Sequence, residues 1–253
     1  MNRIKIFLIM LAAQFMLSFS VAAQKQFKAL LIPTTNGWRH ESVHAGVLAI
    51  QQLAVKNFFD VVYFDDPGSF NDKNLAQFQV IIFLNTTGNI LDSAQQRVME
   101  RFIRSGKGFV GIHSASDTHY GWEWYTKLVG RMFYVHPVIQ TAKLKILDPK
   151  FPGLQGFADG KLWTDEFYEF GAEKISGLQY ILGIDETTYN PKVDWGSRKS
   201  EGMGALHPLS WYHNYDGGRS FYTALGHLPS VFSEQAFLNH LYAGILWAAT
   251  GKK

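Results

Sequence analysis

The chain has 253 residues, a formal net charge of +3 and no cysteine. Without cysteine it has no disulfides, no thiolate metal ligands and no cysteine nucleophile. Its basic residues are scattered along the sequence, so we expect no nucleic-acid partner. Aromatic residues make up 15% of the chain. Most of them must be core, but aromatic faces also bind the apolar faces of sugar rings, so the composition favours a small-molecule carbohydrate partner.

The first 23 residues are typical of a secretory signal peptide. Arg3 and Lys5 precede an apolar run over 6–19, and small residues follow as far as Ala23. We therefore expect a signal peptide at 1–23, a single α/β domain at 24–253, and secretion into a bacterial periplasm. An uncleaved anchor is the alternative. After cleavage, 22 basic residues face 21 acidic ones, and no later run is long enough to span a membrane.

Short apolar runs alternate with amphipathic segments in the first half of the chain. The predicted strands there are 27–32, 60–64, 80–84 and 108–112, and the predicted helices begin at about Ser42, a good N-cap residue, and cover 93–104. This alternation indicates a doubly wound, mainly parallel sheet. Between 138 and about 215, short alternating segments such as 141–147 and 179–184 predict antiparallel additions. A strand at 220–225 and an apolar helix at 233–249 follow.

The strand at 108–112 leads into a turn that resembles a nucleophile elbow. The pentapeptide is Gly-Ile-His-Ser-Ala, with His113 where such elbows hold serine or cysteine. Histidine at this place can act as a general base or as a metal ligand. Asp117, four residues later, would orient a histidine or act separately. The alternative is that His113 only caps the following helix.

Residues 40–44 match the zinc-protease pattern H-E-x-x-H. In those proteases both histidines lie on one face of a long helix, whereas here the pattern spans a loop and the predicted N-cap Ser42. We interpret the match as accidental. His40 itself follows the first strand and could reach the same cleft as His113.

Three later segments place polar side chains beside aromatic residues or at strand ends. His136 closes the segment 130–137, and Asp165 and Glu166 lie within the segment 163–168. His227 follows the strand at 220–225 and so repeats the arrangement of His113. An ordinary solvated turn is the alternative for the paired carboxylates. Ligands bind at the carboxyl ends of strands in open α/β sheets, so we expect these side chains to converge.

Several motifs together resemble the ThuA-like, or trehalose-utilisation, family. They are W-R-H at 38–40, G-I-H-S-A-S-D-T at 111–118, G-R-M-F-Y-V-H-P at 130–137, D-E-F-Y at 165–168, H-P at 207–208 with Trp211, and G-R-S-F-Y-T-A-L-G-H at 218–227. The likeness covers about residues 28–250. It implies a flavodoxin-like sheet of the class I glutamine amidotransferase-like type and a role in sugar catabolism, on disaccharides and glycosides that pass through 3-oxo intermediates. Amidotransferase activity is excluded because the cysteine is missing.

The leading hypothesis is an enzyme that hydrolyses a glycoside or cleaves a 3-oxo-glycoside by elimination. Such a site needs a base, an acid and a group that stabilises an enediolate oxygen. The candidate catalytic residues are His113, Asp117, Glu166 and His40. The candidate substrate-binding residues are His136, Tyr168, Trp211, Arg219 and His227. The sequence identifies no definite cofactor, but a divalent metal is a candidate, with His40, His113, His136 and His227 as its candidate ligands.

Two other classes of function stay open at this point. The chain could be a non-catalytic carbohydrate-binding module, with Trp122, Trp124, Trp163 and Trp211 as stacking platforms. It could also be a partner domain of a sugar oxidoreductase in the same pathway.

Overall fold

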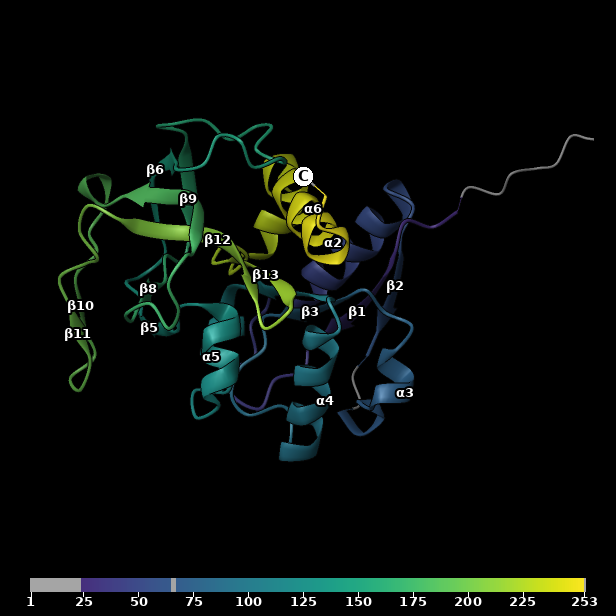
Figure 1. Ribbon diagram of the computed structural model, residues 1–253. Coiled ribbons are helices and arrows are strands. Elements are labelled where there is room, and N and C mark those ends of the chain that lie inside the picture. The colour runs from purple at the N-terminus through teal and green to yellow at the C-terminus, as the bar shows by residue number, and fades with distance from the viewer. Residues whose placement is uncertain (1–23, 65–66, 253) are drawn as a thin grey trace, which may run out of the picture.

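A nine-stranded mixed sheet runs through the molecule in the computed structural model, which describes residues 24–64 and 67–252 (Figure 1). In spatial order its strands are β2 (Asp60–Tyr63), β1 (Lys28–Ile32), β3 (Val80–Leu84), β4 (Gly108–Ile112), β13 (Gly218–Thr223), β12 (His207–Tyr215), β9 (Gln179–Asp185), β6 (Gln140–Ile146) and β7 (Leu162–Asp165). The first five are parallel neighbours, and the remaining pairings are antiparallel. The parallel part has the flavodoxin-like order 2-1-3-4-5, so the predicted fold class is confirmed.

Helices cover both faces of the parallel strands. Helices α2 (Val43–Lys56) and α6 (Gln235–Thr250) lie on one face, and α3 (Asp72–Leu75), α4 (Ser93–Arg104) and α5 (Glu123–Val129) lie on the other (Figure 1). Burial on both faces explains why β3 and β4 are apolar throughout. Two small ribbons accompany the antiparallel half: β5 (Phe133–Val135) pairs with β8 (Glu169–Phe170), and β10 (Val193–Asp194) pairs with β11 (Lys199–Ser200).

The antiparallel half of the sheet curls back toward the parallel half. Three strands separate β13 from β7, so in a flat sheet these two strands would lie about 19 Å apart. Yet a side-chain oxygen of Asp165, the last residue of β7, is 2.9 Å from the backbone nitrogen of Gly226, three residues after β13. The curl therefore brings the end of β7 to the end of β13.

Helix α4 has its predicted bounds and α2 begins after Ser42 as predicted, but of the two helices α4 alone has a side-chain cap at its N-terminus. At the N-terminus of α4, the Asp92 side chain accepts hydrogen bonds from the backbone of Ala94 and Gln95, and the Gln95 side-chain oxygen accepts one from the Asp92 backbone N–H. Ser42 precedes α2 as expected, but its side chain makes no capping hydrogen bond. Its hydroxyl donates instead to the carbonyl oxygen of Gly226 at 2.9 Å.

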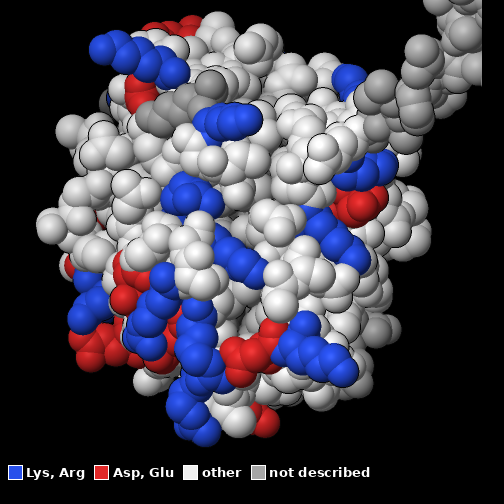
Figure 2. Space-filling model, turned by 45° about the vertical axis from the view of Figure 1, so that its right-hand side comes forward, with Lys and Arg blue, Asp and Glu red and all other residues white. Residues whose placement is uncertain are grey.

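The surface carries charges of both signs. Figure 2 shows one face on which Lys and Arg side chains are spread out, with Asp and Glu side chains among them, most of these toward its lower end. Ion pairs such as Arg101 with Asp72 and Lys127 with Glu123 are exposed, and pairs of this kind contribute little to stability. In the described part of the chain, no helix combines the length and apolar character that crossing a membrane requires. The predicted signal peptide lies outside the described residues.

Candidate active site

His113 lies at the carboxyl end of β4 in a strained backbone conformation. Its φ is +48°, in the left-handed region that residues other than glycine seldom adopt, and it starts a short 3₁₀ helix, His113–Asp117. The ring caps no helix; its Nδ1 donates to the carbonyl oxygen of Ala224 at 2.7 Å. Strain of this kind costs about 1–3 kcal/mol and occurs preferentially at functional sites. The turn is thus an elbow that presents an imidazole.

Four polar side chains converge beside this elbow from the ends of four strands. They are His40 after β1, His113 after β4, Glu166 after β7 and His227 after β13. Glu166 Oε2 is 3.0 Å from His227 Nδ1 and 3.5 Å from His113 Nε2, and these two ring nitrogens are 3.3 Å apart. The ring of His40 packs edge-on against both, with centroids 4.8 Å from His113 and 5.3 Å from His227.

Asp165 fixes the backbone around this cluster. Its side chain is fully buried, with Oδ1 accepting from the backbone nitrogens of Glu166 and Leu228 and Oδ2 accepting from Gly226. The alternative of a solvated turn at residues 165 and 166 is therefore wrong. Through these hydrogen bonds Asp165 holds in place the two chain segments that carry Glu166 and His227.

The loop that carries His227 is anchored from its other side as well. The carbonyl oxygen of Gly226 accepts hydrogen bonds from the Ser42 hydroxyl and the Asn85 amide, and Asn85 also donates to Ser42 at 2.8 Å. Gly226 has a φ of +118°, a conformation that only glycine adopts readily. This backbone conformation explains why glycine precedes His227.

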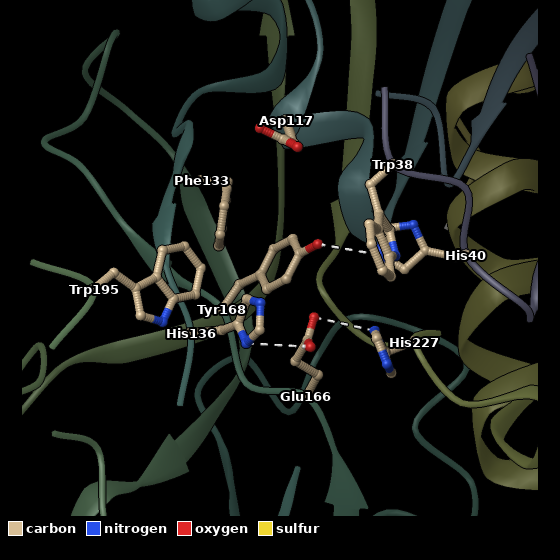
Figure 3. A pocket seen from close by; sticks show the side chains of 9 residues that line it. All are labelled: Trp38, His40, Asp117, Phe133, His136, Glu166, Tyr168, Trp195 and His227. Atoms are coloured by element: carbon tan, nitrogen blue, oxygen red, sulfur yellow. Dashed lines mark hydrogen bonds and ion pairs between the residues drawn. The ribbon is translucent and has the colours of Figure 1, made fainter. Parts of the chain in front are cut away.

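A cavity of about 360 Å³ opens above the cluster, a size typical of small-molecule sites. Figure 3 shows Asp117 and Glu166 entering from opposite sides, with the Tyr168 ring between them. Phe133, His136 and Trp195 are grouped on one side, and the His136 Nδ1 lies 3.2 Å from Glu166 Oε1. The lining residues are Trp38, His40, Asp117, Phe133, His136, Glu166, Tyr168, Trp195 and His227.

The surroundings lower the pKa of one carboxyl group in the site, Glu166, and raise the pKa of another, Asp117. Burial alone would raise the pKa of Glu166, but hydrogen bonds with His113 and His227 and the nearby histidine charges lower it well below its usual range. Burial lowers the pKa of His227, but Glu166 outweighs this and raises it. Burial, assisted by the neighbouring histidines, lowers the pKa of His40 to about 3. Burial raises the pKa of Asp117.

Most of the predicted site residues lie at this cavity. His40, His113, Glu166 and His227 form the cluster, while His136, Tyr168 and Asp117 line the walls. Asp117 does not orient His113; its carboxylate accepts from the Tyr120 hydroxyl at 2.8 Å, and the Ala224 carbonyl orients the ring instead. His44 is exposed on α2, in keeping with an accidental H-E-x-x-H match.

Two predicted substrate-binding residues are elsewhere, which corrects the sequence-based assignment. Trp211 is fully buried in the core and donates its indole N–H to the Val129 carbonyl. Arg219 lies at the opposite end of β13 from His227 and donates to the carbonyls of Ala248 and Gly106. The tryptophans proposed as stacking platforms, Trp122, Trp124, Trp163 and Trp211, do not line this cavity either.

Three aromatic residues of the cavity wall were not among the predicted site residues. Trp38, Phe133 and Trp195 line the cavity, and 72% of Trp38 and 45% of Trp195 are exposed. Trp195 belongs to the turn between β10 and β11, and its ring centroid lies 4.9 Å from that of His136. Trp38 and Phe133 carried a signal in the sequence, through the W-R-H motif at 38–40 and the G-R-M-F-Y-V-H-P motif at 130–137, whereas Trp195 lies in none of the motifs.

Comparison with known proteins places the chain in a family. No curated protein matches it. A protein described as ThuA-like from Bacteroides uniformis ATCC 8492 shares 20% identity and a TM-score of 0.76, over 92% of this chain and 95% of that one. A second, from Parabacteroides merdae ATCC 43184, shares 19% identity and a TM-score of 0.72, over 90% and 91%.

A more distant likeness relates the chain to part of a larger protein. The β-galactosidase from Bacillus circulans sp. alkalophilus shares 14% identity and a TM-score of 0.55, over 92% of this chain but 32% of that one. Likenesses at these identities show the fold alone. The sequence model of the ThuA family, described as trehalose utilisation, matches residues 28–248, and the chain therefore belongs to the ThuA family.

Proposed function

We propose that this protein is an enzyme that cleaves a glycoside or 3-oxo-glycoside by acid–base chemistry. One observation carries the proposal: a cavity with aromatic walls has a buried histidine–carboxylate cluster on one side and Asp117 on the other (Figure 3). Aromatic faces suit a sugar ring, while a site for binding alone has no need of so many titratable groups. The family's description as trehalose utilisation supports a disaccharide as substrate.

The two sides of the cavity suit the two parts of such a reaction. A carbonyl at C3 of a sugar acidifies the hydrogen on C2. Asp117 would take this proton, since burial raises the pKa of its carboxyl and makes the carboxylate a stronger base. The histidine–carboxylate cluster would bind the C3 oxygen and stabilise its developing negative charge.

The remaining steps need only water as a further reactant. The electron pair of the C2–H bond forms the enolate, whose collapse restores the C3 carbonyl and breaks the bond from C1 to the glycosidic oxygen. His136, on the cavity wall, would give the leaving oxygen its proton. Water then adds across the C1–C2 double bond, and the net result is hydrolysis.

We also propose that the reaction takes place in the periplasm of a bacterium. The support is the signal-like sequence of residues 1–23, with its basic start, apolar run and small residues before Gln24. N-terminal sequencing of protein recovered from a periplasmic fraction tests this, and a chain that still begins at Met1 in the cytoplasmic fraction contradicts it.

Incubation with disaccharides and their 3-oxo forms, trehalose included, tests the reaction. We expect release of monosaccharide from the 3-oxo substrate and, in D₂O, deuterium at C2 detected by NMR. Asp117→Asn should slow both by about 10²–10⁴-fold. Asp60→Asn, on the outer strand β2, is the matched control and should leave both unchanged.

The alternatives give different results in the same assays. Tight sugar binding with no product and no exchange at C2 indicates the carbohydrate-binding module. Turnover that appears only when a sugar oxidoreductase is added, with no turnover of an authentic 3-oxo substrate, indicates the partner domain. Either result rejects the proposed enzyme.

A further inference from the structure

The four side chains of the cluster have the composition of a metal-binding site. His40, His113 and His227 each offer a ring nitrogen and Glu166 offers a carboxylate oxygen, and these four atoms all lie within 4.8 Å of one another. Three histidine nitrogens and one carboxylate oxygen suit Zn²⁺ and related first-row divalent ions. All four side chains are buried or largely so, which limits competition from water.

The distances in the cluster agree with ligands arranged around one ion. Zn–N and Zn–O bonds of about 2.0–2.1 Å place neighbouring tetrahedral ligands about 3.4 Å apart. The separations among His113 Nε2, His227 Nδ1 and Glu166 Oε2 are 3.3, 3.0 and 3.5 Å. Three of the four ligand atoms are thus already at the spacing that one ion requires. His40 needs only a small shift to become the fourth ligand.

The hydrogen bonds behind the cluster orient His113 as a ligand. The Ala224 carbonyl can only accept, so the Nδ1 of His113 carries the proton and the Nε2 of the neutral ring has a free lone pair. That nitrogen lies 3.5 Å from Glu166 Oε2, so a cation between the two atoms would contact both ligands. A backbone carbonyl behind a histidine is also the usual support of a metal ligand.

We infer that His40, His113, Glu166 and His227 bind one divalent first-row transition metal ion, with Zn²⁺ as the reference member. The ion lies at the floor of the cavity, on the side opposite Asp117 (Figure 3). Its role in turnover rests on the proposed function: as a Lewis acid it would bind the C3 oxygen of the sugar. Its binding to the protein does not depend on that function.

Metal analysis and titration of the full mature chain test the inference. Protein stripped with a chelator is titrated with Zn²⁺ by calorimetry, and Co²⁺ is added separately to record its visible absorption. We expect one ion per chain and the intense bands of low-coordinate Co²⁺. Removing a ligand by Glu166→Gln or His227→Ala should weaken Zn²⁺ binding by more than the 10–100-fold typical of outer-sphere partners.

His44→Ala is the matched control, because His44 is exposed and completes the H-E-x-x-H pattern. It should bind Zn²⁺ like the unaltered chain, and thermal unfolding of each stripped variant shows which of them are folded. No stoichiometric binding of Zn²⁺ or Co²⁺, or equal binding by folded Glu166→Gln and His227→Ala, overturns the site. One bound ion without turnover of 3-oxo sugars supports the site and rejects the proposed function.

Discussion

Asp165 holds Gly226 in place through a buried hydrogen bond of 2.9 Å from the glycine N–H to Oδ2. Together with the hydrogen bond from the Leu228 N–H to Oδ1, this contact connects the antiparallel end of the sheet to the loop after the last parallel strand. Each partner is next to a residue of the cluster, Glu166 on one side and His227 on the other. Asp165 thus determines how close the carboxylate and the imidazole can come.

Replacing Asp165 by Asn should destabilise the fold and loosen the site. The carboxylate accepts three backbone hydrogen bonds, whereas an amide has one oxygen and would turn its NH₂ toward an N–H donor. We expect a loss of roughly 1.5–3 kcal/mol in the free energy of unfolding, measured by urea titration. Unchanged stability would mean that these buried bonds do not support the loop.

Gly226→Ala should be costly because of the backbone, and a Cβ there would also come within 3.2 Å of Phe232 Cζ and 3.3 Å of Ile112 Cγ2. At a φ of +118° a side chain is strained, and we expect a loss of about 1–3 kcal/mol in the free energy of unfolding. Gly121→Ala is the control, since Gly121 does not have a positive φ and a methyl group there would contact nothing within 4 Å. Equal unfolding midpoints for the two variants would contradict the prediction.

His113→Asn should separate the chemical role of the ring from the strain of its backbone. Asparagine tolerates the left-handed conformation better than most residues other than glycine, so this variant should fold. Turnover of the 3-oxo substrate should fall by about 10²–10⁴-fold. His113→Ala should be about 1–2 kcal/mol less stable than His113→Asn. Wild-type activity in folded His113→Asn would remove His113 from the mechanism.

The stability of the fold should depend on pH through a histidine far from the site. His240 is fully buried, neither of its ring nitrogens has a hydrogen-bond partner among the residues that the structure describes, and its ring centroid lies 5.2 Å from that of Phe221. Burial lowers its pKa from 6.5 to about 3. Below pH 6.5 the unfolded chain binds a proton here that the folded chain does not, so acid reduces stability by about 1.4 kcal/mol per pH unit until the pH approaches 3.

His240→Phe should remove this contribution. Urea unfolding between pH 6.5 and 4.5 should give a slope of stability against pH that is shallower by about one proton than in the unaltered chain. His44→Phe, at an exposed histidine of α2, should keep the original slope. Identical slopes for His240→Phe and the unaltered chain would show that His240 does not control the acid response.

Trp195→Ala should weaken substrate binding with little effect on the chemical step. Trp195 is on the cavity wall and 45% exposed, so a sugar can stack on it. We expect KM to rise by about 10-fold, with kcat within about twofold of the original value. Trp124→Ala is the comparison, because Trp124 does not line this cavity. A larger rise in KM for Trp124→Ala would place the sugar elsewhere.

The parallel half of the fold and much of the cluster could be predicted from the sequence, because local patterns determine both. The apolar runs at Val80–Leu84 and Gly108–Ile112 are buried strands, and the residues that follow strand ends meet at one edge. The curl of the antiparallel half could not be predicted, since it depends on contacts between segments far apart in the chain. For the same reason the place of Trp195 and the core position of Trp211 were missed.

The spread of the cluster over the chain has a consequence for folding. His113 and His227 are 114 residues apart, yet their ring nitrogens are 3.3 Å from each other. Contacts of such long range form late, after the loops between them have closed. A nascent chain that ends before β13 therefore has no complete cluster, and ligand binding reports on the fully assembled sheet rather than on any folding intermediate.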